Sequence, residues 1–297
     1  MAKRINISQL KSKLRQIESK QRQAISKQNQ AIRQHNQKVR SAVNKYNSAV
    51  RQYNARVRAN RQRITNELNR LQTRTTVRYQ VLHTSALTLN TAYQTLERHE
   101  SEFENVPFGN QFLDLSEREN ANSLAVSNSL ESEERQGAIG DEGELAGTVI
   151  TDELRNISHD LDSRWRGALF SLSPRNPDAP RHFCTSAREI FIQILDHFAP
   201  DSSVLSRFQN CEKTDNGQPT RLWKIKHILV NAAIVSEQAA DFVDEDVTNV
   251  LQLFRVFNDG THGSAGTFEF AQLRAIKERV ESGLVYLTTL CENATSP

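Results

Sequence analysis

The first third of the chain lacks both glycine and proline. All eleven glycines and all seven prolines of the 297-residue chain lie after residue 106. Because these two residues interrupt helices, their absence favours a long helical segment over a compact domain. The composition therefore predicts a domain boundary near residue 106.

Cysteine is also scarce, and long apolar runs are missing. The three cysteines, Cys184, Cys211 and Cys291, are odd in number and too far apart for a disulfide framework or a paired CxxC metal site. No apolar run is long enough for a signal peptide or for a membrane span of about 18 residues. We therefore expect a cytoplasmic protein in a reducing compartment, with no membrane partner.

Acidic residues are almost absent from the start of the chain. Residues 1–78 hold 20 Lys and Arg against Glu18 and Glu67, whereas residues 79–297 hold 18 basic and 33 acidic residues. The overall charge of +3 thus hides a segment of +18 and a segment of −15.

Apolar residues in the basic segment follow a heptad pattern. One series is Ile25, Ile32, Val39, Tyr46 and Tyr53, and the other is Val43, Val50, Val57, Ile64 and Leu71. The spacing predicts a coiled coil, and β-branched residues at one position favour a parallel homodimer. Asn29 and Asn36 extend the second series and would set the register. We predict a basic coiled-coil rod over residues 1–105.

The rod contains one weak point, where β-branched residues cluster between Thr73 and Val77. The sequence leaves open whether the helix continues through this cluster or folds back at it.

The excess of arginine on the rod indicates an anionic partner. A row of cations on a rigid helix binds phosphates of any nucleotide sequence, RNA or another nucleic acid included. The alternatives are a solvated helix face and the acidic half of another copy. The predicted nucleic-acid-binding residues are Arg51, Arg56, Arg58, Arg61 and Arg63.

Residues 106–147 are predicted to be an acidic linker. Residues 100–144 contain twelve acids against Arg118 and Arg135, with little apolar periodicity. The acidic run 129–134 could also lie against the rod as an internal counterion.

Helical periodicity returns in residues 148–297. Apolar stripes predict helices near 151–172, up to Phe198, over 222–235, around 243–254 and around 273–287. No segment alternates with a period of two, so the fold class is all-α: a long N-terminal coiled coil followed by a helical bundle.

Common catalytic motifs are missing from this domain. There is no phosphate-binding loop, no dinucleotide-binding glycine motif and no HExxH. The acidic groups 159–162 and 244–246 suit helix starts and surfaces better than metal sites. We therefore predict no metal and no cofactor.

The segment from Arg255 to Gly263 is the most suggestive constellation. Arg255, Asn258 and His262 follow an apolar helix, and this spacing resembles the signature of the HEPN ribonucleases. These small all-α domains dimerise to bring two such motifs together and cleave RNA without metal. Arginine would bind the scissile phosphate, histidine would move protons, and Asn258 would orient either group. His262 as a turn residue satisfied by local backbone is the competing interpretation.

A wider resemblance covers residues 154–290. The segments 164–169, 178–182 and 185–189 look like the predicted nuclease domain that accompanies prokaryotic PIWI proteins in anti-phage systems. The resemblance implies a nuclease with Arg188 as a further candidate beside Arg255 and His262. Three other Arg–His pairs in the chain have similar spacing, so spacing alone selects none of them.

Two functional hypotheses follow. The first is a dimeric, metal-independent ribonuclease effector of a bacterial anti-phage defence system, whose rod dimerises and holds nucleic acid. The second is a non-enzymatic coiled-coil adaptor that binds nucleic acid or a partner protein.

Overall fold

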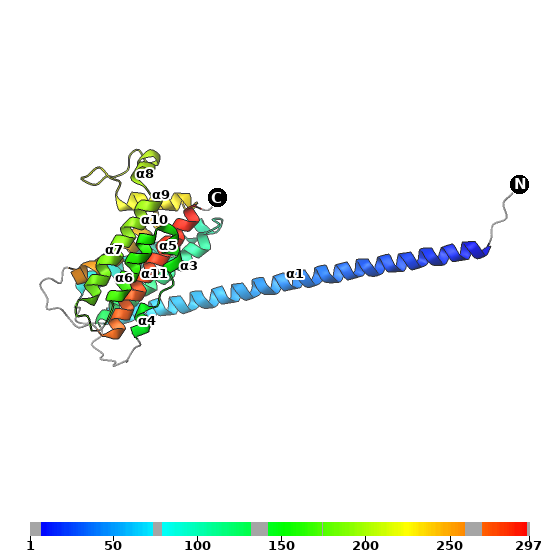
Figure 1. Ribbon diagram of the computed structural model, residues 1–297, viewed down its shortest axis with the longest axis horizontal. Coiled ribbons are helices and arrows are strands. Elements are labelled where there is room, and N and C mark those ends of the chain that lie inside the picture. Colours follow the sequence, from blue (N-terminus) through cyan, green and yellow to red (C-terminus); the bar gives the residue numbers. More distant parts are fainter. Residues whose placement is uncertain (1–6, 74–78, 132–141, 174, 259–268, 296–297) are drawn as a thin grey trace. The chain divides into compact units, whose positions relative to one another are not determined.

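Helices make up nearly all of the described chain (Figure 1). The structure is a computed structural model that describes residues 7–73, 79–131, 142–173, 175–258 and 269–295. Within these ranges the only β-type pairing is an isolated bridge between Lys213 and Pro219. The predicted all-α class is confirmed. None of the helices in the described ranges is long and apolar enough to cross a membrane.

The chain divides into two compact units, residues 1–59 and residues 60–297. Helix α1 (Ile7–Gln72) supplies all the described structure of the first unit and its last turns belong to the second. The predicted long N-terminal helix is therefore confirmed. The first unit alone, at about 1.5 Å per residue, gives roughly 80 Å of helix.

The second unit begins with a reversal of the chain. Helix α1 ends at Gln72 and α2 (Gln80–Arg98) follows. The Arg61 Nη2 atom of α1 lies 2.8 Å from the Glu97 Oε1 atom near the end of α2. Because Glu97 is far along α2, this ion pair requires α2 to return along α1. The fold-back alternative is the one realised, and residues 74–78 between the helices lie outside the described residues.

The remaining helices complete the second unit. They are η1 (Glu100–Phe103), α3 (Gly109–Glu131), α4 (Glu142–Ala146), α5 (Thr151–Ile157), α6 (His159–Ser171), α7 (Ala179–Phe198), α8 (Asp201–Arg207), α9 (Arg221–Asn231), α10 (Glu237–Asn258) and α11 (Phe270–Thr295). The single helix expected over 151–172 is divided at Ser158, because the Ser158 hydroxyl accepts a hydrogen bond from the Asp160 N–H and begins α6.

The core of the bundle lies around α10 and α11. Helix α2 packs against α10, α3 packs against α11, and α7 packs against both α10 and α11, with α6 outside α7. The α11 helix approaches its neighbours closely at Gly283. A Cβ atom there would lie 3.2 Å from the Phe191 ring of α7 and 3.2 Å from a methyl group of Val250 in α10.

The linker predicted over residues 106–147 is wrong for its first half. Residues 109–131 form α3, whose buried face carries many polar side chains, among them Ser116, Asn120 and Ser123. Several of these side chains have partners in other helices: Ser116 contacts the Tyr286 hydroxyl at 2.9 Å, and Asn120 donates to Asn90 at 3.1 Å. A polar face of this kind has no apolar periodicity, so the sequence pattern did not reveal the helix.

The predicted seam from Ile25 to Leu71 also needs correction. Ile64 and Leu71 are buried in the core of their own unit, and Asn128 of α3 donates a hydrogen bond to the Glu67 carbonyl at 2.9 Å. The side chains at the last two seam positions are therefore already packed against residues of their own chain. Only the part of the seam that precedes them is available to a partner.

We predict that residues 148–297, the domain expected from the sequence, do not fold alone, whereas residues 60–297 do. Deleting α2 removes four large buried side chains, which contribute about 6–12 kcal/mol at roughly 1.5–3 kcal/mol each. Those side chains are Leu82, Leu89, Tyr93 and Leu96. This loss is comparable with the whole stability of a domain, about 5–15 kcal/mol.

Thermal unfolding followed by circular dichroism compares the two fragments. The longer fragment should melt cooperatively, and the shorter one should be insoluble or show no transition. A cooperative transition of the 148–297 fragment at the same temperature would contradict the assignment of α2 and α3 to this domain.

Candidate active site

The predicted catalytic arginine lies in the last turn of α10. The side chain of Arg255 is exposed, and it makes no hydrogen bond or ion pair with any residue that the structure describes. Asn258 is the last residue of α10, and nothing is described of its side chain. His262 lies outside the described residues. The structure therefore places the arginine and leaves the placement of the histidine as a prediction.

The secondary candidate, Arg188, lies in the middle of α7, level with the last turn of α10. Helices α7 and α10 run in opposite directions (Figure 1), and they meet where the rings of Phe191 and Phe254 pack with centroids 6.1 Å apart. Arg188 precedes Phe191 by three residues and Arg255 follows Phe254 by one. In antiparallel helices both positions fall on the same side of this ring contact.

Arg188, like Arg255, has a guanidinium group without a partner among the residues described. Its side chain is exposed and has no ion pair or hydrogen-bond partner within the described ranges. Most arginines of the bundle are engaged instead; Arg221, for example, donates to Asp244 and Thr248 at 2.7 Å each. Two unengaged guanidinium groups on the same side of the Phe191–Phe254 contact are available to an anionic ligand.

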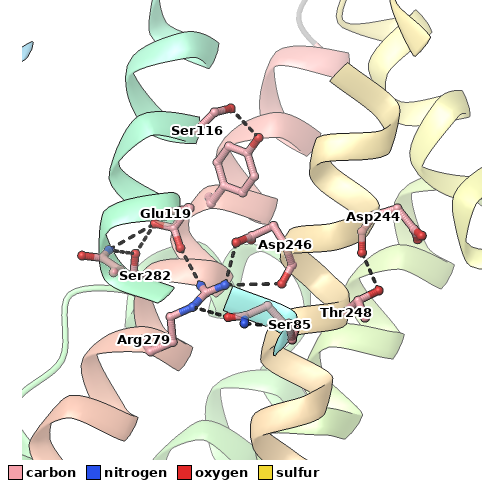
Figure 2. Close-up of polar contacts among 11 residues, drawn as sticks. Ser85, Ser116, Glu119, Asp244, Asp246, Thr248, Arg279 and Ser282 are labelled. Carbon is pink, nitrogen blue, oxygen red and sulfur yellow. Dashed lines mark hydrogen bonds and ion pairs between the residues drawn. The ribbon is translucent and has the colours of Figure 1, made fainter. Parts of the chain in front are cut away.

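A second group of charged residues, which the sequence analysis missed, is buried between α3, α10 and α11 (Figure 2). The Arg279 guanidinium donates to Glu119 at 2.7 Å and to Asp246 at 2.6 Å. Its Nε atom donates to Asn249 at 3.2 Å, and Asn249 donates to Ser85 of α2 at 3.2 Å. Three helices therefore meet at one guanidinium, and Asn249 links them to α2.

This buried group does not touch a substrate, because its three charged side chains are only 1–3% exposed. Its role is to position the helices on either side of residues 259–268. The sequence does contain a signal for this buried group. Arg279 falls within the apolar stripe of Ile276, Val280 and Leu284, and a cation on a buried helix face needs a buried partner.

Two carboxyl groups share this single guanidinium. Burial raises the pKa of Glu119 to about 7, although Arg279 and the hydrogen bond from Ser282 oppose the shift. Burial also raises the pKa of Asp246, although the Arg279 guanidinium opposes this shift. The cluster therefore tends to hold one proton near neutral pH, which removes its excess negative charge.

The acidic groups considered as metal ligands are paired with arginines. Asp160 contacts Arg164 at 2.6 Å, and Asp162 contacts Arg155 and Arg166 at 3.2 and 3.0 Å. In the part of the chain that the structure describes, no three His, Cys, Asp or Glu side chains are grouped to hold a metal ion.

The arginines predicted to bind nucleic acid divide into two sets. Arg51, Arg56 and Arg58 are exposed on α1, and Arg56 lies over the Tyr53 ring at 5.6 Å. Arg61 and Arg63 instead hold α1 to the bundle, through Glu97 and through a 2.8 Å hydrogen bond to Asn122. The first set remains the better candidate for a phosphate-binding surface.

Fold and site together define an all-α domain with two exposed arginines, Arg188 and Arg255, that are unengaged by the residues described. Residues 154–287 match the model of a protein family described as "Predicted pPIWI-associating nuclease". This match confirms the resemblance drawn from the sequence for this part of the chain. It runs from within α5 to within α11 and excludes α1, α2, α3 and α4. No curated protein and no solved structure matches the chain.

We predict that Glu119 makes the stability of the protein depend on pH. Its pKa in the folded protein, about 7, exceeds its ordinary value of 4.5, so between these values the folded state keeps a proton that the unfolded chain has lost. The free energy of unfolding should therefore fall as pH rises from about 4.5 to 7, by up to about 3 kcal/mol from this group. Glu119→Gln should remove this component.

Urea denaturation at pH 4.5, 6 and 7.5 measures the effect in both proteins. Glu278→Gln, at an exposed glutamate of α11, is the control and should keep the pH dependence of the unchanged protein. Equal pH slopes for the unchanged protein and Glu119→Gln would show that Glu119 is ionised throughout.

Proposed function

We propose that the chain is a metal-independent endoribonuclease of the HEPN type, active as a homodimer, that serves as an effector of a bacterial anti-phage defence system. The observation that carries the proposal is the pair of exposed, unengaged arginines, Arg188 and Arg255, within a domain of a predicted nuclease family. Arg255, Asn258 and His262 are the proposed catalytic residues.

The chemistry follows from these residue types. His262 takes the proton from a ribose 2′-hydroxyl, the 2′-oxygen attacks phosphorus, and the bond from phosphorus to the 5′-oxygen breaks. The leaving 5′-oxygen takes the proton that His262 has accepted, and the products are a 2′,3′-cyclic phosphate and a 5′-hydroxyl. Arg255 stabilises the charge that develops on the phosphate oxygens.

Dimerisation is supported by the exposed apolar stripe on α1. Ile25 is 57% exposed, Val39 is 47% exposed and Val50 is 37% exposed. A heptad stripe of this length would leave water when a second copy packs on it, and its β-branched residues suit a parallel pair. In the proposed dimer the seam runs from Ile25 to Val57, because Ile64 and Leu71 pack within their own chain.

The dimer has a catalytic purpose in this proposal. HEPN-type cleavage uses two copies of the arginine and histidine motif in one cleft, and pairing through α1 raises the local concentration of one half-site at the other. Arg51, Arg56 and Arg58 of each copy would hold RNA by its phosphates.

An adaptor function is the second candidate. It is favoured by the exposed arginines of α1, which would bind nucleic acid without any chemistry at α10. In that case the protein binds RNA with a steep dependence on salt concentration and never cleaves it.

We predict that Arg255→Ala and His262→Ala each lower RNA cleavage in the presence of EDTA. Loss of a donor to the developing charge should reduce kcat about 10²–10³-fold, and loss of the proton-transfer group about 10²–10⁴-fold. Gel analysis of a labelled single-stranded RNA measures both rates, and mass spectrometry detects the cyclic phosphate.

Arg274→Ala is the matched control for Arg255→Ala. Arg274 is an exposed arginine of α11 that pairs with Glu144 and Glu278, so its removal should leave cleavage unchanged. The enzyme proposal fails if both catalytic variants cleave at the rate of the unchanged protein.

We predict that Val43→Lys together with Val50→Lys converts the dimer to monomers. Buried lysines on a seam that is already basic add repulsion and desolvation cost. Ser41→Lys together with Ser48→Lys adds the same charge on the opposite helix face and should leave the dimer intact. Light scattering after size-exclusion chromatography gives the mass, and a monomeric unchanged protein would refute the dimer.

A further inference from the structure

A groove of about 350 Å³ runs between α2 and α10. The two helices are antiparallel, because the rings of Tyr93 and Phe242 pack with centroids 6.2 Å apart, and Ser85 accepts a hydrogen bond from Asn249 at 3.2 Å. The start of α2 therefore lies beside the last turns of α10, where Arg255 is found. The groove occupies this part of the helix pair.

Polar groups and one exposed apolar side chain form the groove. Its principal lining residues are Gln80, Val81 and Thr84 of α2 and Glu245, Thr248 and Gln252 of α10. Val81 is 56% exposed, so a hydrocarbon surface meets solvent among hydrogen-bonding groups. Lys and Arg are absent from the residues that line the groove. The groove therefore suits a flat ligand with an apolar face and a polar edge better than it suits a phosphate.

Two of the polar side chains have no partner in the part of the chain that the structure describes. Glu245 and Gln252 make no hydrogen bond or ion pair there. Partial burial and the neighbouring Asp244 raise the pKa of Glu245, although Arg221 opposes this shift. The Arg221 guanidinium donates instead to Asp244 at 2.7 Å. The Glu245 carboxylate thus lacks a donor to compensate its partial loss of water, and an N–H group of a ligand would supply one.

Arg255 continues the face of α10 that lines the groove. Successive residues of an α-helix are about 100° apart, so the three groove residues of α10 and Arg255 fall within an arc of about 80°. Arg255 follows Gln252 by three residues, or about 4.5 Å along the helix axis. A nucleotide chain with a phosphate on Arg255 therefore has a neighbouring base within reach of the groove.

We propose that the groove between α2 and α10 binds an RNA base with an exocyclic amino group, which donates to Glu245 while Arg255 holds the adjoining phosphate. The inference rests on the proposed function and deepens it by naming a base preference. Carboxylates accept hydrogen bonds from the amino group of cytosine, and amides such as Gln252 pair with base edges. Uracil carries a carbonyl oxygen in place of that amino group, and this oxygen repels the Glu245 carboxylate.

The preference depends on a helix outside the matched region. Gln80, Val81 and Thr84 belong to α2, whereas the match to the nuclease family begins at residue 154. The α2 helix thus completes the groove from its second side, in addition to its part in the core.

The test compares two single-stranded RNAs of eight nucleotides that differ only in cytosine or uracil on both sides of one linkage. All other 2′-hydroxyl groups are methylated, so only that linkage can be cleaved. The unchanged protein should cleave the cytosine RNA with a kcat/KM about 5- to 100-fold higher than the uracil RNA. Equal kcat/KM values for the two RNAs would overturn the inference.

Glu245→Gln should bring the ratio of the two kcat/KM values to about one. The amide can accept from the cytosine amino group and can also donate to the uracil oxygen, and it has the same size as the carboxyl group. Glu237→Gln is the control on the same helix; Glu237 pairs with Lys226 outside the groove, so the ratio should stay unchanged. A preference for cytosine that persists in Glu245→Gln would contradict the role of Glu245.

Thr84→Trp tests the groove from the side of α2. Thr84 is exposed, so the indole should fill the groove without disturbing the core, and KM for the cytosine RNA should rise about 5-fold or more. Thr91→Trp, at an exposed threonine of α2 beyond the groove, should leave KM unchanged. Circular dichroism checks that both variants fold. An unaltered KM in folded Thr84→Trp would place the base elsewhere and overturn the inference.

The outcomes separate this inference from the proposed function. Cleavage of both RNAs without a base preference would overturn the groove as a base site and retain the enzyme. Absence of cleavage of either RNA, and of unmethylated RNA, would overturn the enzyme and this inference with it.

Discussion

The Arg279 guanidinium is the interaction on which the arrangement of the bundle depends. It is buried with two carboxylates from different helices, and removal of one partner from such a group typically costs about 3–5 kcal/mol. Glu119 comes from α3, outside the region that matches the nuclease family, whereas Asp246 and Arg279 lie within it. The α3 helix is thus an integral part of the domain, and the matched region is incomplete without it.

This buried group also explains how the proposed active site can be both rigid and open. Arg279 joins α11 to α10 and α3, so the helices on either side of residues 259–268 are held in register. The guanidinium groups proposed to meet RNA, those of Arg188 and Arg255, are instead exposed and unengaged by the residues described. One set of arginines stabilises the fold, and the other remains available to phosphates.

The heptad pattern of α1 serves two structural purposes. Its last members, Ile64 and Leu71, contribute to the core of the bundle, whereas the members before Val57 stay exposed. The end of this stripe therefore packs within its own domain, and the earlier part is exposed and forms the seam of the proposed dimer. In the proposed dimer the length of the seam is limited by this division, and the arginines at 61 and 63 mark its boundary through their contacts with α2 and α3.

The sequence by itself determined which segments form helices with a buried apolar face. Apolar periodicity located α7, α9, α10 and α11, the absence of glycine and proline located α1, and the segments 164–169 and 185–189 carried the resemblance to the nuclease family. Tertiary structure alone decided that α3 is a core helix, that the chain reverses after Gln72 and that Arg279 has two buried acids as partners. The physical reason is that an apolar stripe in the sequence predicts a buried helix face. A polar face gives the same sequence pattern whether its hydrogen bonds go to water or to another helix. Only when distant helices come together do Ser116, Glu119 and Asn120 acquire the partners that allow them to be buried.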